Sequence, residues 1–106
     1  MMASGSTADD VLEMAVLQVK PGLELDFEHA FSVAQALIAD APGYLGHQLR
    51  RCVEHREQYL LLVRWRDLKD HTEGFRKSAA YLEWKQLLHR FYEPMPTVEH
   101  YAPVRL

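Results

Sequence analysis

His71 is the residue of this sequence best placed to move a proton. It comes six residues after Trp65, which ends an apolar, strand-like run. A histidine with its ordinary pKa of about 6.5 exchanges protons at neutral pH. Asp67 precedes His71 by four residues, so on a helix its carboxylate would share a face with the imidazole and could orient the ring. The alternative interpretation of His71 is a surface histidine, or a structural one that caps a loop.

Aromatic and cationic side chains flank this histidine. Trp65 and Phe75 lie on either side of it in the sequence and could shape a pocket that stacks on an aromatic ligand. The alternative for Trp65 is a core position packed against helices. Arg76 could hold an anionic substrate or a dimer contact, and its alternative is a solvated or ion-paired surface arginine.

The other histidines and the single cysteine suggest no metal centre. His47 and His100 fall in expected strands, where either could face a pocket or a partner, while His89 suits the surface at the end of the last helix. The six histidines form no metal-binding pattern such as H-x-H or H-E-x-x-H. Cys52 alone excludes both an intrachain disulfide and a cysteine zinc cluster. We therefore expect no metal and no other cofactor.

Length and charge limit the class of protein. The 106 residues suit one domain, predicted to span residues 11–106 after a disordered leader of residues 1–10 that is not a signal peptide. The formal charge of −3 gives no basic footprint for nucleic acid. No apolar run approaches the roughly 20 residues that cross a bilayer. We expect a cytoplasmic protein that binds neither nucleic acid nor membrane.

Hydrophobic periodicity and turn residues predict six main elements. They are strands at residues 11–20, 44–53, 58–66 and 97–103, and helices at residues 24–40 and 78–92, with a short helical turn capped by Asp67. The order β-α-β-β-α-β is typical of an α+β, ferredoxin-like fold, a four-stranded antiparallel sheet with two helices on one face.

The second face of this sheet is expected to bind another copy of the chain. The first strand is apolar on both sides, and Leu60, Leu61 and Leu62 are consecutive. Two helices cover only one face, so the apolar residues of the other face need a partner. We predict a homodimer whose sheets pack face to face. Tyr81 and Trp84 fall on the apolar stripe of the last helix, which favours core positions over pocket positions.

Several short motifs occur in an order and spacing that are typical of one family. They are Pro21-Gly22, Ala41 to Gly46, Tyr59 to Trp65, Asp70-His71, Phe75-Arg76 and Pro96 to Tyr101. Through them the chain resembles the antibiotic biosynthesis monooxygenase (ABM) family of dimeric α+β barrels, over about residues 11–103. The fold of this family hosts several functions, so the resemblance alone does not select one reaction.

The resemblance implies an oxidoreductase that works without a cofactor. Characterised relatives oxidise polycyclic phenols or hydroquinones to quinones with O₂, without metal or flavin. The substrate would lie in a dry pocket between sheet and helices, where deprotonation gives an electron-rich anion that itself reduces O₂. Other relatives bind and degrade haem, and others are dimeric small-molecule binders or have no known role.

The site residues implied by the resemblance are only partly present. Quinone-forming relatives use an Asn and a Trp around the third strand and a Tyr soon after it. Trp65 matches the Trp, whereas Leu61 and His71 stand where the Asn and the Tyr would be. The chain has no Asn, so it also lacks the Asn of the haem-degrading relatives, and Gly74 and Trp84 stand near their Trp and His.

These considerations give a specific expectation for the site. His71 and Trp65 are the expected catalytic residues of a monooxygenase for a small aromatic or polyketide-like phenol. Gln48 or His47 would support the oxyanion in place of the missing Asn, provided that it faces the pocket. The expected substrate-binding residues are Phe75, His47, Gln48, Arg76 and Trp84. The competing prediction is a non-catalytic dimeric binding protein or a stress-related protein, and haem binding is a further alternative.

Overall fold

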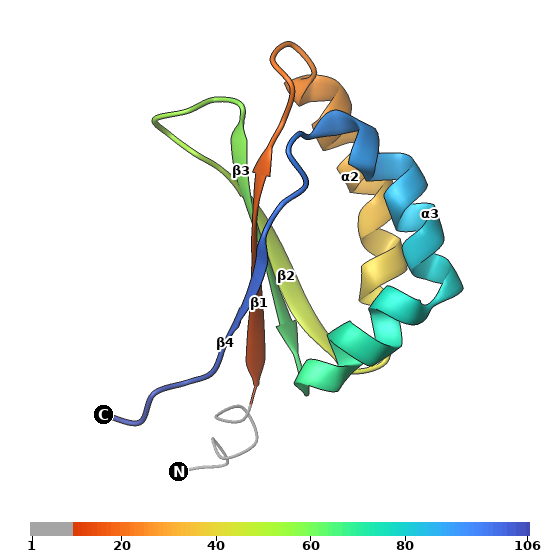
Figure 1. Cartoon of the computed structure of the whole chain (residues 1–106), viewed down its shortest axis with the longest axis vertical. Helices are drawn as coiled ribbons and strands as arrows, with labels where there is room; N and C mark the ends of the chain where they lie inside the picture. The colour runs from red at the N-terminus through yellow and green to blue at the C-terminus, as the bar shows by residue number, and fades with distance from the viewer. Residues whose placement is uncertain (1–9) are drawn as a thin grey trace.

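Four antiparallel strands form one sheet, and two α-helices pack on one of its faces (Figure 1). This computed structural model describes residues 10–106. The elements are β1 (Val11–Gln18), α2 (Glu24–Ala39), β2 (Tyr44–Arg51), β3 (Gln58–Trp65), α3 (Ala79–Leu88) and β4 (Val98–Tyr101). The sheet order is β2-β3-β1-β4, so the predicted ferredoxin-like fold is confirmed.

The predicted boundaries agree with these elements to within a few residues. The last helix is shorter than expected, because α3 ends at Leu88 and a 3₁₀ turn over His89–Phe91 follows it. Of the predicted leader, only Asp10 lies among the described residues, and its carboxylate pairs with the Arg64 guanidinium at 2.9 Å. Within residues 10–106, no helix has the length and the apolar character needed to cross a bilayer.

Buried and partly buried residues alternate along β1 and β3, so the two faces of the sheet differ in burial. Ala15 and Leu17 of β1 and Leu61 and Val63 of β3 are buried beneath the helices. The helices contribute a matching set of buried side chains, namely Phe27, Phe31, Ala34 and Ile38 from α2 and Trp84 and Leu88 from α3. The core therefore fills the space between the sheet and the helices.

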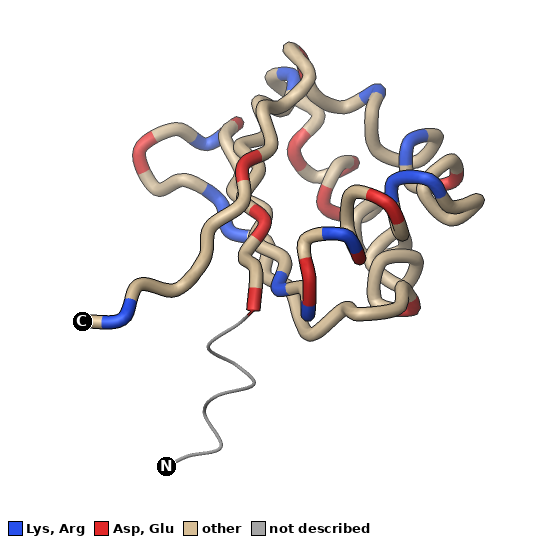
Figure 2. Tube along the Cα trace, turned by 60° about the horizontal axis from the view of Figure 1, so that its bottom comes forward, with Lys and Arg blue, Asp and Glu red and all other residues tan. Residues whose placement is uncertain are grey.

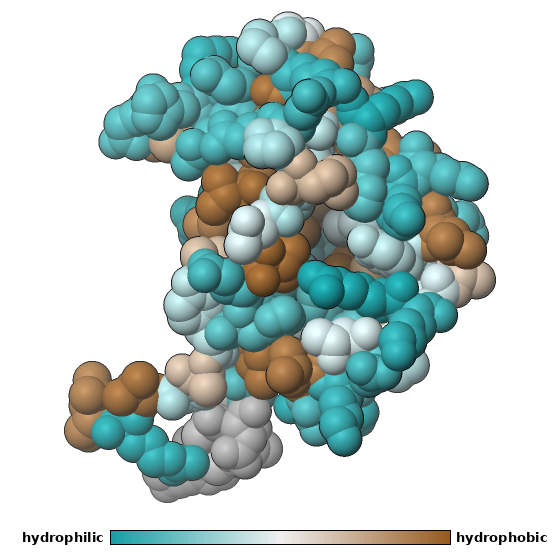
Figure 3. All heavy atoms as spheres, in the orientation of Figure 1, coloured by the Kyte–Doolittle hydropathy of each residue, from teal (hydrophilic) through white to brown (hydrophobic). Residues whose placement is uncertain are grey.

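Among residues 10–106, no element covers the opposite face of the sheet. Its central positions are Leu12, Met14 and Val16 of β1 and Leu60 and Leu62 of β3, all only partly buried. Hydrophobic side chains accordingly reach the surface along the sheet (Figure 3). We call these five residues the open face. Acidic and basic residues are interspersed along the described chain (Figure 2).

The segment between β3 and α3 carries His71 and is built from two irregular turns. A π-helix, η1, spans Asp70–Gly74, and a 3₁₀-helix, η2, spans Phe75–Lys77. The Asp67 carboxylate accepts a bond from the Lys69 amide at 3.2 Å. Ser78 then caps α3 by accepting a bond from the amide of Tyr81 at 3.2 Å, as its sequence position predicts. These turns place η1 and η2 beside the end of β3, on the side of the sheet that carries the helices (Figure 1).

Candidate functional site

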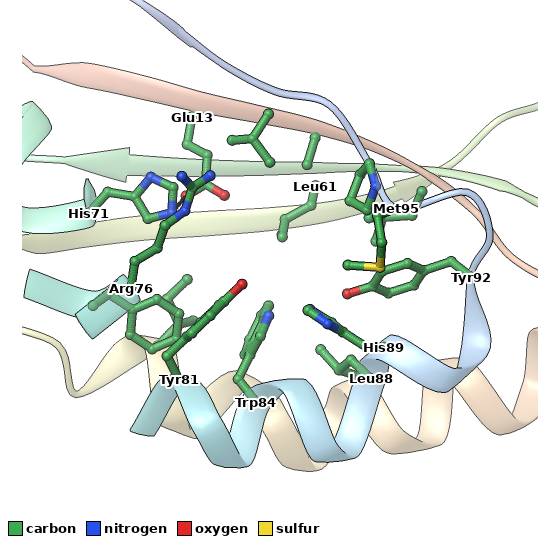
Figure 4. Close-up of a pocket in the computed structure, with 16 residues that line it drawn as sticks. Glu13, Leu61, His71, Arg76, Tyr81, Trp84, Leu88, His89, Tyr92 and Met95 are labelled. Atoms are coloured by element: carbon green, nitrogen blue, oxygen red, sulfur yellow. Dashed lines mark ion pairs between the residues drawn. The ribbon is translucent and has the colours of Figure 1, made fainter. Parts of the chain in front are cut away.

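A cavity of about 120 Å³ lies between the sheet and α3 (Figure 4). Its wall combines residues from β1, β3, η1, η2, α3 and the segment that leads into β4. Apolar and aromatic lining residues include Ala15, Leu17, Leu61, Phe75, Tyr81, Trp84, Leu88, Tyr92, Met95 and Val98. Polar lining residues are fewer, and three of them, Glu13, His71 and Arg76, lie together at one end (Figure 4). A mainly apolar pocket with a few convergent polar groups is the usual form of a small-molecule site.

Glu13 is a buried carboxyl group at this polar end. Only 5% of the residue is exposed, and its Oε1 accepts a hydrogen bond from Nε1 of Trp65 at 2.9 Å. Nε2 of His71 lies 3.4 Å from the same oxygen. Burial raises the pKa of Glu13, against the smaller lowering effects of the Trp65 hydrogen bond and the Arg76 charge. The carboxyl group therefore binds a proton more readily than an exposed glutamate.

His71 is buried beside Glu13 and held on several sides. Its ring stacks on Trp65, with centroids 5.3 Å apart and planes inclined by 17°. Its Nδ1 lies 2.8 Å from Nε2 of His100. Burial, followed by the charges of Arg76 and His100, lowers the pKa of His71 to about 3. The ring is therefore neutral at neutral pH, and its 3.4 Å contact with Glu13 is not an ion pair.

The register of β4 against β1 brings His100 into this group. His100 pairs with Glu13 across the two strands, so both side chains point to the helix-covered face. His100 is half-buried, and burial together with the Arg76 charge lowers its pKa. Residues from β1, β3, η1 and β4 thus meet in one series of polar contacts at the polar end of the cavity.

Arg76 supplies positive charge at the same place. Its side chain extends from η2 toward the His71 ring and the Glu13 carboxyl group (Figure 4). Among the described residues, no carboxylate lies within ion-pair distance of its guanidinium, in contrast to Arg51, Arg64 and Arg66. This guanidinium is the cation nearest to any ligand at the polar end.

The opposite end of the cavity is formed by aromatic rings and a thioether. His89 lies between Tyr81, at a centroid distance of 6.2 Å, and Tyr92, at 5.5 Å. The predicted surface position of His89 is wrong, because its ring is half-buried and lines the cavity, and burial lowers its pKa. Met95 closes this end from the segment before β4 (Figure 4).

The structure brings together four of the expected site residues. His71, Phe75, Arg76 and Trp84 all line the cavity. Trp65 does not line it, because its fully buried ring lies behind His71 and contacts Glu13 through the indole N–H. The alternative interpretation of Trp65 as a core aromatic thus describes its position.

His47 and Gln48 lie away from the cavity. The His47 ring contacts the Tyr44 hydroxyl and Oε1 of Gln35, the latter at 2.9 Å, near the β2 edge of the sheet. Gln48 is exposed on the opposite face of the sheet, where its Oε1 accepts a bond from Arg50 at 2.8 Å. Gln48 was expected to support the oxyanion only if it faced the pocket, and it faces away from it.

The expected pairing of Asp67 with His71 is wrong. Asp67 is exposed and binds the backbone amide of Lys69, whereas His71 is buried under the sheet. The segment forms a π-helix rather than an α-helix, and the pairing assumed α-helical spacing. Glu13 takes the orienting position that was assigned to Asp67.

Sequence reasoning missed Glu13 and did not assign His100 to the site. The sequence pattern that could have revealed Glu13 is an acidic residue inside an apolar strand, on the same face of the strand as Ala15 and Leu17. A carboxylate on that face must be buried and therefore needs hydrogen-bonding partners. Within the described chain, no group of three or more His, Cys, Asp or Glu side chains is arranged to hold a metal ion.

Comparison with known proteins gives the family. The sequence profile of the family called antibiotic biosynthesis monooxygenase matches residues 10–87, well over half of the chain. The chain belongs to the antibiotic biosynthesis monooxygenase family. It is 55% identical over 94 residues to YczJ of Bacillus subtilis, an uncharacterised protein, covering 89% of this chain and 99% of that one.

Two solved structures show the same fold. A Bordetella bronchiseptica protein that carries the family's name matches with a TM-score of 0.87 at 34% identity, over 92% of this chain and 99% of that chain. SnoaB of Streptomyces nogalater, described as a cofactor-independent oxygenase, matches with a TM-score of 0.72 at 22% identity, over 92% and 94% of the two chains. At that identity the similarity to SnoaB concerns the fold alone.

Proposed function

We propose that this protein is a monooxygenase that oxidises a small phenol with O₂ and needs no cofactor. The observation that carries the proposal is the cavity between the sheet and α3, which combines an aromatic wall with a buried pair of proton-binding groups, Glu13 and His71. Membership of a family named for monooxygenases supports the reaction class. The similarity to SnoaB, itself described as a cofactor-independent oxygenase, is in keeping with that class.

The polar end supplies what the first chemical step requires. A phenol reacts with O₂ only after its hydroxyl group loses a proton, because the anion is the electron donor. Glu13 and His71 offer proton-binding atoms inside a largely apolar cavity. The Arg76 guanidinium would stabilise the phenolate, in place of the oxyanion donor expected from Gln48.

The reaction balances with O₂ as the only other reactant. The phenolate transfers electrons to O₂, and a carbon–oxygen bond forms at a ring carbon that bears hydrogen, giving a peroxide anion that takes up a proton and becomes a hydroperoxide. Loss of that hydrogen as a proton and cleavage of the O–O bond give a quinone and hydroxide. The hydroxide takes up a proton and leaves as water. One oxygen atom enters the product and the other becomes water.

The cavity volume favours a substrate with one ring. A cavity of about 150 Å³ lined by apolar side chains holds a benzene molecule, and this cavity measures about 120 Å³. The volume is somewhat below that value, so a single phenol or hydroquinone ring is the nearest fit, whereas a three-ring anthrone would require α3 or the Met95 segment to move. A porphyrin would require a larger displacement, so haem is a poorer fit.

The test is oxygen uptake with a panel of phenols in metal-free buffer. The panel contains monocyclic hydroquinones, naphthols and anthrones of increasing size. We expect uptake that is proportional to protein concentration, unchanged by chelator and fastest for monocyclic compounds. Phenols that bind to the protein and consume no O₂ would contradict the proposal and favour the non-catalytic binding protein.

We also propose that the open face joins two copies of the chain. Leu12, Met14, Val16, Leu60 and Leu62 form a continuous apolar centre on a face that no element of the described chain covers. Arg50 and Arg64 lie at the margin of this face, where their charges remain in water. A two-fold axis through the centre would bury the same residues from each copy, as symmetric dimers do. The cavity lies on the other side of the sheet, so each copy keeps a complete cavity.

A further inference from the structure

A chain of three side chains leads from the cavity to the edge of the sheet. Glu13 lines the cavity, and its Oε1 lies 3.4 Å from Nε2 of His71. Nδ1 of His71 lies 2.8 Å from Nε2 of His100. His100 belongs to β4, which is an edge strand, and its side chain is only partly buried. The two nitrogens of the His71 ring therefore connect a buried carboxyl group to a ring near the solvent.

Two complete hydrogen-bonding patterns are open to these three residues when the 3.4 Å contact between Glu13 and His71 shortens to a hydrogen bond. With Glu13 ionised, His71 donates from Nε2 to the carboxylate and accepts at Nδ1 from Nε2 of His100. With Glu13 protonated, the carboxyl group donates to Nε2 of His71, which then donates from Nδ1 to His100. A neutral imidazole has one donor and one acceptor nitrogen, so each pattern fixes the tautomer of both rings.

Burial and charge decide which group holds the proton. The pKa of Glu13 is raised by burial, and the pKa of His71 is lowered to about 3 by burial and by its neighbours. A proton that enters this group therefore binds to Glu13, and a doubly protonated His71 is not formed near neutral pH. The other polar groups that face the chain are the Trp65 indole N–H from β3 and the Arg76 guanidinium from η2.

We propose that Glu13 accepts the proton of the substrate hydroxyl, and that His71 and His100 carry protons between Glu13 and the solvent at β4, which ionises Glu13 before the reaction and protonates it again afterwards. The role of Glu13 toward a substrate rests on the proposed function. The exchange of protons along the three residues does not, because it occurs in the protein without substrate. Glu13 therefore takes the role of proton acceptor that was expected of His71, and His71 positions Glu13 and relays protons.

The proton steps balance over one turnover. Protonated Glu13 gives its proton to Nε2 of His71, the Nδ1 proton of His71 passes to Nε2 of His100, and Nδ1 of His100 releases a proton to water. Both rings end as the opposite tautomer. Glu13, now ionised, accepts the substrate hydroxyl proton and later gives it to the departing hydroxide. Oxidation of a phenol to a quinone and water releases no net proton, so a proton then returns along the same path to Glu13 and restores both tautomers.

Nuclear magnetic resonance of the substrate-free protein tests the relay directly. The Glu13 carboxyl carbon is followed with pH together with the ring nitrogens of His71 and His100. We expect the carboxyl group to titrate above the ordinary range of a glutamate, and both rings to exchange tautomers at the same pH. Rings that keep one tautomer while Glu13 titrates would overturn the relay, whatever the protein does with phenols.

Glu13→Gln tests the role of the carboxyl group. Its amide oxygen can still accept the Trp65 bond, but it cannot take up a proton, so the tautomer exchange at that pH should disappear. The control is Glu99→Gln, the same change at the residue next to His100 on β4, where the side chain is exposed and points away from the cavity. This control should keep the exchange. If Glu13→Gln does not fold, the titration of the unaltered protein still decides.

Kinetics separate the inference from the proposed function. With a phenol that the unaltered protein oxidises, Glu13→Gln should lower kcat about 100-fold and leave KM nearly unchanged. An unchanged kcat would overturn Glu13 as the acceptor while leaving the monooxygenase proposal intact. If no phenol is oxidised although the tautomers exchange, the proposed function and the acceptor role of Glu13 fail together, and the proton relay stands.

Discussion

The imidazole of His71 lies nearly parallel to the indole of Trp65, with ring centroids 5.3 Å apart. This contact fixes the plane of the imidazole, and with it the directions in which its two nitrogens point. The indole N–H also binds Glu13, so Trp65 orients both members of the buried pair. Trp65, which was expected to be catalytic, thus lies behind the cavity and contacts two of the groups that line it.

His71 should make the stability of the protein depend on pH. The unfolded chain binds a proton at the ordinary histidine pKa of about 6.5, whereas the folded ring has a pKa of about 3. Stability from His71 is therefore present above pH 6.5 and is lost as the pH falls toward 3, by a few kcal/mol in total. Glu13 acts in the opposite sense, because its raised pKa favours the folded state until the pH rises through that value.

The measurement is the urea midpoint between pH 4.5 and 7.5. His71→Phe keeps a ring against Trp65 and should flatten the fall in stability below pH 6.5, whatever its stability at neutral pH. His55→Phe is the control, because His55 is exposed in the hairpin between β2 and β3. Equal slopes for the two variants would show that His71 is not held in its neutral form by folding.

Arg76 should contribute to the reaction through its charge. Arg76→Gln removes the guanidinium at the polar end and should lower kcat/KM for an oxidised phenol by about 10- to 100-fold, the value of one charge-assisted hydrogen bond. Lys77→Gln is the neighbouring control, since Lys77 pairs with Glu73 at 2.8 Å on the surface. Steady-state oxygen uptake compares the two. Similar values for both variants would remove Arg76 from the site.

Gly43 should be irreplaceable in the turn before β2. Its φ of +85° disfavours any side chain, and a Cβ atom there would lie 2.1 Å from Oδ2 of Asp70. Asp70 begins η1, which carries His71, so Gly43→Ala should displace the site as well as cost about 1–3 kcal/mol. Gly46→Ala is the control, because its nearest atom would be Nη1 of Arg64 at 3.7 Å. Thermal unfolding measures both, and equal losses would contradict this explanation.

The open face should determine the assembly state. Leu62→Asp places a charge at the centre of this face and should convert a dimer into a monomer, since an unpaired charge cannot be buried there. Leu25→Asp is the control, because Leu25 of α2 is 77% exposed. Sedimentation at several protein concentrations gives the result. A dimer that survives Leu62→Asp would move the interface elsewhere.

The fold could be predicted from the sequence because its signals are local. Helical spacing of apolar residues marks α2 and α3, and Pro21-Gly22 and Pro42-Gly43 mark the turns beside α2. The site could be predicted only in part. His71, Phe75, Arg76 and Trp84 were found from residue type and order, and all four line the cavity.

The remaining parts of the site depend on non-local geometry. Leu45 is an extra residue at the bulge between Tyr44 and Gly46, so the alternation along β2 shifts by one position and Gln48 points away from the helices. The pairing of β4 with β1 places His100 opposite Glu13 although they are far apart in sequence. Neither the bulge nor this register leaves a mark in the local pattern of residues.

Incorporation of oxygen from ¹⁸O₂ tests the monooxygenase proposal most directly. A monocyclic hydroquinone or phenol is incubated with the protein in metal-free buffer, and product and water are analysed before the quinone oxygens exchange with solvent. The account predicts one ¹⁸O atom in each newly oxidised product molecule and the second ¹⁸O atom in water. An unlabelled product with hydrogen peroxide in equal amount, or no product from any phenol that binds, would contradict it.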